Sequence, residues 1–292
     1  MTTAAVAVPV SRTGHDTVPL LRLCAAELRW IFRRPRTLGV LGLLALVPIV
    51  IGIGLTFVSQ NSGSNAPDDS GGALLASAVN NAFVLPIAAM VMTLTLLLPL
   101  ASAMAGADAI AGEAAHGTLR GWLIAPVSRG RLLAVKAFGV ATVSVVAVLS
   151  MCVTGVVTGL IINGTDSLFT LSGTTLSLGE ALLRILLVGG WIVLQLWAVG
   201  AVALAVSSWT EHPMLVVASV LAGNIVFTIL GFLDSLKWLH PFLLTKDWTL
   251  APAAVLQDPM TLTTFSEGAV RAACYIVVGL SLAYGRLATR DG

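Results

Sequence analysis

The stretch from Asp108 to Lys136 holds the residues of this sequence whose types and spacing are best suited to chemistry or binding. It lies between two long apolar runs and contains four basic and two acidic side chains, namely Arg120, Arg129, Arg131, Lys136, Asp108 and Glu113. A charged, partly ordered segment of this kind can form charge-assisted hydrogen bonds with a partner protein. We therefore interpret it as a docking element, the alternative being a basic loop that only orients the chain in a membrane.

The sequence lacks the common motifs of catalytic and metal-binding sites. It has no GxxxxGK[ST] phosphate loop, no HExxH, no CxxC and no GxSxG. The histidines are scattered, and the cysteines (Cys24, Cys152 and Cys274) are far apart and are expected to act as small apolar side chains without a disulfide. We predict no catalytic residue, no metal site and no cofactor bound by this chain.

The composition indicates a membrane protein. Of the 292 residues, 57% are hydrophobic and 10% are charged, whereas soluble domains carry about 25% charged residues. A membrane-spanning helix needs about 20 apolar residues, and six runs meet this need, at residues 38–58, 83–107, 133–162, 182–208, 214–233 and 269–287. We predict an all-α membrane protein in which residues 37–292 form a domain of six transmembrane helices.

The N-terminal segment divides into two parts. Residues 1–18 are small, polar and unpatterned, which predicts a disordered cytoplasmic tail. Within residues 19–36, apolar side chains recur at three- and four-residue spacing, and arginines occupy the other face, at Arg22, Arg29, Arg33 and Arg36. This pattern predicts an amphipathic helix that lies in the membrane interface. A role of these arginines as orientation signals is an alternative that does not exclude the helix.

The distribution of basic residues predicts the orientation. Twelve of the sixteen Lys and Arg residues lie in the N-terminal segment, the loop after the second span and the C-terminal tail. The positive-inside rule then places both termini and the Asp108–Lys136 loop in the cytoplasm.

The predicted spans contain few polar groups. Gln195 and Asn224 are the clearest polar side chains at depth, and they either line a substrate path or form hydrogen bonds between helices. The scarcity of carboxylates in the spans argues against a carrier driven by protons or sodium ions. If the protein moves a substrate, we therefore expect its energy to come from outside the chain.

Two segments outside the spans carry prolines that interrupt helical patterns. In the loop assigned to residues 108–132, Pro126 is expected to end a short helix near Ala125, and Ser128 could cap a second helix that begins near Arg129. Residues 234–267 contain three prolines, and their apolar pieces are too short to span a bilayer. We expect short re-entrant or interfacial helices there, with Trp238 and Trp248 at the interface, or otherwise a surface loop.

The loop also resembles a known family. Its Glu113, then Gly117–Thr118–Leu119, then Pro126–Val127–Ser128–Arg129, then Lys136 are similar to the E…GT(L)…PVSR…K signature of ABC-2-type transporter permeases. The resemblance implies the transmembrane subunit of a bacterial exporter in the plasma membrane. The resemblance implies that the loop, including Arg120, contacts an ATPase subunit. The amphipathic helix predicted at residues 19–36 would touch the same subunit. Residues 234–267 would form re-entrant helices on the outer side.

The resemblance also implies partners. Two copies of a cytoplasmic ATPase subunit would bind ATP and Mg, and a second permease chain, identical or different, would complete the assembly in the lipid bilayer. We expect no nucleic-acid partner. The nearly uncharged spans favour a hydrophobic or amphipathic substrate such as a drug, an antibiotic or a lipid-like molecule.

Two other function classes stay open at the level of sequence. A secondary transporter or channel would move its substrate without an ATPase. A membrane-embedded enzyme or assembly factor would yield a transformed product, although no catalytic motif supports it.

Overall fold

The protein is described here by a computed structural model that covers residues 19–61, 77, 81–115, 117, 128–164, 170, 174–260 and 262–289. Its helices, in chain order, are α1 (Leu20–Arg33), α2 (Pro35–Asn61), α4 (Val84–Leu94), α5 (Leu97–Ala107), the π-helix η1 (Asp108–Gly112), α6 (Glu113–Ala115), α8 (Arg129–Asn163), α9 (Leu178–Ser207), α10 (Pro213–Gly231), the 3-10 helix η3 (Asp234–Phe242), α11 (Leu250–Val255) and α12 (Thr263–Thr289).

The long helices coincide with the predicted spans. Within the described residues, α2, α8, α9, α10 and α12 are long and apolar enough to cross a membrane. The second predicted span, residues 83–107, is not one straight helix, because α4 and α5 meet at an angle of 56°. Counting this bent pair as one span gives the six that the apolar runs predict.

A proline explains the bend. Pro99 has no N–H group, so it cannot donate the helical hydrogen bond to the carbonyl oxygen of Thr95, four residues earlier. That oxygen instead accepts a hydrogen bond of 3.0 Å from Nδ2 of Asn224, in α10. A side chain from another helix therefore satisfies the carbonyl that the proline frees.

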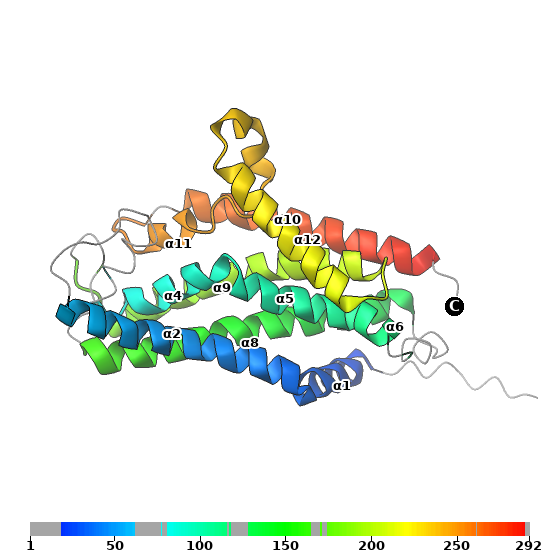
Figure 1. Ribbon diagram of the computed structural model, residues 1–292, viewed down its shortest axis with the longest axis horizontal. Coiled ribbons are helices and arrows are strands. Elements are labelled where there is room, and N and C mark those ends of the chain that lie inside the picture. The colour runs from blue at the N-terminus through cyan, green and yellow to red at the C-terminus, as the bar shows by residue number, and fades with distance from the viewer. Residues whose placement is uncertain are drawn as a thin grey trace, which may run out of the picture.

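The helices run side by side along the long axis of the molecule (Figure 1). We call one end, which holds α1, α6, the start of α8 and the end of α12, the α1 end. The opposite end, which holds α11 and the starts of α9 and α12, is called the α11 end. Helix α10 starts at the α1 end and diverges from the rest, so its far end and the gold segment after it project from the bundle (Figure 1).

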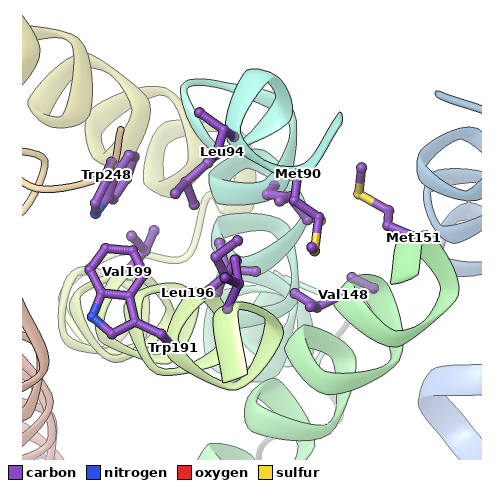
Figure 2. Close-up of a cluster of buried hydrophobic side chains, with 14 of the residues drawn as sticks. Met90, Leu94, Val148, Met151, Trp191, Leu196, Val199 and Trp248 are labelled. Atoms are coloured by element: carbon purple, nitrogen blue, oxygen red, sulfur yellow. The ribbon is translucent and has the colours of Figure 1, made fainter. Parts of the chain in front are cut away.

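The core lies between α4, α8 and α9. Figure 2 shows Met90 and Leu94 of α4 facing Leu196 of α9, with Val148 and Met151 of α8 beside them. Inside a bilayer such contacts act through close packing, since lipid tails are as apolar as the side chains. Small residues make the packing close: a Cβ atom on Gly106 of α5 would lie only 2.6 Å from the Cβ of Ala203 in α9.

The segment between α10 and α12 differs in one respect from the expectation. It forms two short helices, η3 and α11, and the Trp238 side chain is 70% exposed. A re-entrant or interfacial position of these helices stays a prediction. The expected interfacial position of Trp248 is wrong, because this side chain is only 5% exposed and lies beside Val199 (Figure 2). Its indole N–H donates to Oε1 of Gln195 at 3.4 Å, so the ring has both an apolar surrounding and a polar partner inside the bundle.

Candidate functional site

A buried lysine joins three segments of the chain at the α1 end. The Lys136 side chain, on the second turn of α8, is 1% exposed. Its Nζ atom donates to both carboxylate oxygens of Glu27 in α1, at 3.0 and 2.9 Å. It also donates to Oε1 of Glu113, the first residue of α6. We call these three residues the Lys136 cluster.

The local sequence explains how the Lys136 cluster is assembled. Helix α8 begins at Arg129, directly after Ser128 as predicted, although the Ser128 side chain makes no capping hydrogen bond. Helix α1 can approach α8 because the contact point is a glycine. A Cβ atom on Gly139 would lie 2.8 Å from Cδ1 of Ile31 and 3.2 Å from Cγ of Glu27.

Charge balance explains why these groups tolerate burial. Removing an ion from water costs several kcal/mol, which is recovered only by well-placed partners of opposite charge. The Lys136 cluster has one cation for two carboxylates, and a second set of charges lies beside it. Asp108, at the start of η1, pairs with Arg34 at 3.3 Å and with Arg36 at 3.6 Å, so the six groups together are neutral when ionised.

Trp30 lies between these two sets of charges. The guanidinium carbon of Arg34 lies 3.2 Å from the centre of the Trp30 ring, and Nζ of Lys136 lies 5.3 Å from it, both within the range of cation–π attraction. Partial burial lowers the pKa of Arg34, and the nearby carboxylate of Asp108 opposes this effect. A cavity of about 30 Å³ between α1 and α8 borders both sets and is large enough for a water molecule.

Arg129 connects the loop to the C-terminal helix. Its guanidinium donates to the carbonyl oxygens of Leu287 at 2.6 Å and Ala288 at 2.7 Å. These carbonyls lie in the last turn of α12, where a cation is favoured by the helix dipole. The sequence predicted Arg129 as a docking residue but gave no sign of this internal contact.

The other predicted loop residues are only partly described. Gly117 follows α6 with a φ of 69°, a left-handed conformation that glycine adopts without strain. Thr118, Arg120 and Pro126 lie outside the described residues. The docking role of the loop stays a prediction.

The four arginines predicted on one face of the N-terminal helix are all exposed, at positions 22, 29, 33 and 36. Of these, Arg36 lies beyond α1 and pairs with Asp108. The position of α1 in a membrane interface stays a prediction.

Gln195 and Asn224 lie away from the Lys136 cluster. Nε2 of Gln195 donates to the carbonyl oxygen of Gly268 in α12 at 3.1 Å, and Asn224 bonds to Thr95 as described above. Both side chains thus form hydrogen bonds between helices, which was the alternative interpretation from the sequence. Asn224 also borders a cavity of about 150 Å³ between α9 and α10, and a substrate path along these residues stays a prediction.

Glu27 is the residue that the sequence analysis missed. A signal for it was present: Glu27 is the acidic residue of a helix otherwise rich in arginine, and it lies three residues after Cys24 and four before Ile31, on the apolar face. A carboxylate on an apolar face requires a buried cation. The sequence could not indicate which lysine or arginine supplies it.

Comparison with known proteins identifies the family. Residues 21–291 match the sequence profile of the family described as ABC-2 family transporter protein. A search of curated proteins found no match. The matched range contains the Lys136 cluster and every helix described above except the first residue of α1. Because nearly the whole chain matches, the protein belongs to the ABC-2 family of transporter permeases.

Proposed function

We propose that this chain is the transmembrane subunit of an ATP-driven exporter that moves a hydrophobic or amphipathic substrate, and that a separate ATPase subunit docks at the α1 end. ABC-2 family membrane proteins work with ATPase subunits and are not themselves ATPases. The α1 end is then cytoplasmic, in agreement with the excess of basic residues there.

The Lys136 cluster is the observation that carries the proposal. A docked ATPase would contact the loop that follows α6 and the exposed arginines of α1. Glu113 and Glu27, from these two segments, both bond to Lys136 of a membrane-spanning helix. A displacement of either segment therefore changes the contacts of α8. Nucleotide on the ATPase could shift the permease between two states if it binds one of them more tightly by several kcal/mol.

The walls of the bundle support the proposed substrate class. The described spans offer mainly apolar and small side chains, which suit a hydrophobic or amphipathic molecule better than a highly charged one. Two permease chains and two ATPase chains would form the complex, with the substrate leaving between the permeases.

Co-purification with the cognate ATPase tests the proposal. We expect the two proteins, extracted in mild detergent, to form a complex with the mass of two chains of each and with measurable ATP turnover. Glu113→Arg places a second cation against Lys136 and should abolish turnover in the complex, and Glu113→Gln, which keeps the volume, should reduce it.

The matched control is Glu211→Arg, an exposed acid at the same end of the bundle, which should retain turnover. Normal assembly and turnover in Glu113→Arg would contradict the role of the cluster. A permease that remains a monomer and ignores the ATPase would favour the secondary transporter or channel.

A further inference from the structure

A large groove opens on the surface of α12 at the α11 end. It has a volume of about 850 Å³ and lies between α12 and the segment that carries Pro241 and Phe242. Its volume falls in the range of sites for drug-sized ligands, about 300–1,000 Å³. The α12 residues that line the groove begin near the start of that helix, which lies at the α11 end, whereas the Lys136 cluster lies at the α1 end (Figure 1).

The α12 wall of the groove changes from charged to apolar along its length. Its residues at positions 267, 271, 274 and 278 share one helix face, because they follow each other at spacings of four, three and four. Glu267 and Arg271 occupy the half near the start of α12, whereas Cys274 and Val278 occupy the half toward the middle of the bundle. Phe242, which is 64% exposed, adds to the apolar surface.

Two charges at the charged half have no partner among the described residues. Arg271 is engaged, since it pairs with Asp247 at 2.8 Å and donates to the carbonyl oxygen of Pro241 at 2.7 Å. Lys246 and Glu267 are exposed, and in the described part of the chain neither forms an ion pair or a side-chain hydrogen bond. The groove therefore offers one available ammonium group and one available carboxylate at the same end.

The dimensions of the groove fit one leaflet of a bilayer. From Glu267 to Val278 the helix rises by roughly 16 Å, at about 1.5 Å per residue, and half of a hydrocarbon core is about 15 Å thick. The charged half lies toward the start of α12 and the apolar half toward its middle, so in a helix that spans the bilayer the charged half would face the lipid head groups and the apolar half the membrane centre. A lipid lying against α12 would match this order of chemistry.

We propose that this groove is a binding site for a zwitterionic phospholipid with a primary amine in its head group. The Lys246 ammonium binds the phosphate, and the Glu267 carboxylate accepts hydrogen bonds from the lipid amine. An acyl chain lies along Cys274 and Val278. The groove discriminates by charge, because an anionic lipid would lack the amine that Glu267 recognises and would be repelled by that carboxylate.

Native mass spectrometry of the delipidated full-length permease, titrated with single lipids, tests the proposal. The probes are phosphatidylethanolamine, phosphatidylcholine and phosphatidylglycerol with identical acyl chains. We expect one phosphatidylethanolamine to bind per chain, about fivefold more tightly than phosphatidylglycerol, as expected for a contribution near 1 kcal/mol from a rim charge. Phosphatidylcholine, whose quaternary amine donates no hydrogen bond, should bind with intermediate affinity.

The variants separate head-group from chain contacts. Glu267→Gln should abolish the preference for phosphatidylethanolamine over phosphatidylglycerol, whereas Lys246→Ala should weaken the binding of all three lipids. Val278→Trp should weaken all three by filling the apolar half. Lys237→Ala is the matched control, because Lys237 lies in the first half of η3, pairs with Asp234 at 3.1 Å and does not line the groove.

Cys274 reports whether a lipid or a second protein chain covers the groove. In a Cys24→Ser background only Cys274 is exposed among the described cysteines, since Cys152 is buried. We expect maleimide to label Cys274 in the delipidated dimer and phosphatidylethanolamine to slow the labelling. A Cys274 that stays unlabelled in the dimer whether or not lipid is present, or an unchanged lipid preference in Glu267→Gln, would overturn the proposal.

Discussion

The Lys136 cluster at the α1 end and two arginines at the α11 end hold their charges in different ways. At the α1 end, the Lys136 ammonium is shared between carboxylate side chains from two separate segments, Glu27 of α1 and Glu113 of α6. At the α11 end, Arg271 and Arg184 each pair with one aspartate, Asp247 at 2.8 Å and Asp258 at 3.6 Å. Each of these arginines also donates to backbone carbonyl oxygens of the segment between α10 and α12.

The difference indicates different mechanical roles. An arginine that bonds to backbone carbonyls fixes the path of the chain, because those carbonyls cannot move without the backbone. A lysine between two glutamates can exchange one partner for the other through side-chain rotation alone. The α11 end therefore resembles a clamp that holds a segment in place, and the α1 end a joint that can rearrange when a partner acts on it.

The largest effect is expected at the joint. Lys136→Met leaves two buried carboxylates facing each other without their shared lysine, and removing one partner of a buried ion pair costs about 3–5 kcal/mol. Thermal unfolding in detergent should show a large loss of stability, and hydrogen exchange should accelerate in α1.

Neutralising Glu27 and Glu113 together with Lys136 should restore most of the stability that Lys136→Met loses. The triple variant Glu27→Gln, Glu113→Gln, Lys136→Met has no buried charge at the joint and should regain most of the wild-type stability. Lys237→Met serves as the control, since exposed ion pairs contribute about 0–1 kcal/mol. A Lys136→Met protein as stable as the wild type would show that the cluster does not hold α1 and α6 together.

A mutation at the clamp should cause a smaller loss of stability, and its effect should stay within the α11 end. Arg271→Ala removes the hydrogen bond to Pro241 and leaves the buried carboxylate of Asp247 without its partner, which places the loss at the lower end of about 3–5 kcal/mol because one carboxylate is left unpaired rather than two. Amide exchange should accelerate in residues 241–248 and stay unchanged in α1. Faster amide exchange at both ends would show that the two ends are coupled and would contradict their separate roles.

Between the two ends, Asn224→Ala should lower the free energy of unfolding by about 1 kcal/mol, because the carbonyl of Thr95 loses its hydrogen-bond donor at a partly buried position. The rescue is Pro99→Ala, which restores an N–H group that can donate to the same carbonyl. The double variant, compared by thermal unfolding, should therefore lose less stability than the sum of the single variants. Strict additivity would disprove the link between the bend and Asn224.

The smallest effect is expected at the contact between the loop and α12. Arg129→Ala should lower the free energy of unfolding by about 0.3–1 kcal/mol, the usual contribution of a cation at a helix C-terminus. Amide exchange in residues 284–289 should accelerate, and Arg129→Lys should keep part of the protection. Arg22→Ala is the control, as an exposed arginine of α1. Unchanged exchange in Arg129→Ala would mean that the carbonyl contacts contribute nothing measurable.

The sequence predicted the long helices well because apolar runs of this length report directly on spans. It also predicted the helix start at Arg129 from Ser128. It did not predict the bend at Thr95, although Pro99 marks the place, because a proline alone does not show whether another helix will support a bend. The donor, Asn224, lies 129 residues away.

The candidate site was predicted only in part, for a similar reason. Glu113, Arg129 and Lys136 were identified from the loop pattern, whereas Glu27 was not. Its separation from Lys136 is 109 residues, and the pairing depends on how α1 packs against Gly139. The buried position of Trp248 also depends on a tertiary contact, with Gln195. Local patterns indicate which side chains are unusual, but only packing determines which of them meet.

The most direct test of the coupling role uses the charge-neutral triple variant of the joint in complex with the ATPase. This variant should fold and assemble, so a change in its ATP turnover reports on coupling rather than on stability. We predict a fall in turnover of about fivefold or more relative to the wild-type complex, as expected for a coupling free energy of about 1–3 kcal/mol. An assembled complex with wild-type turnover would contradict the account.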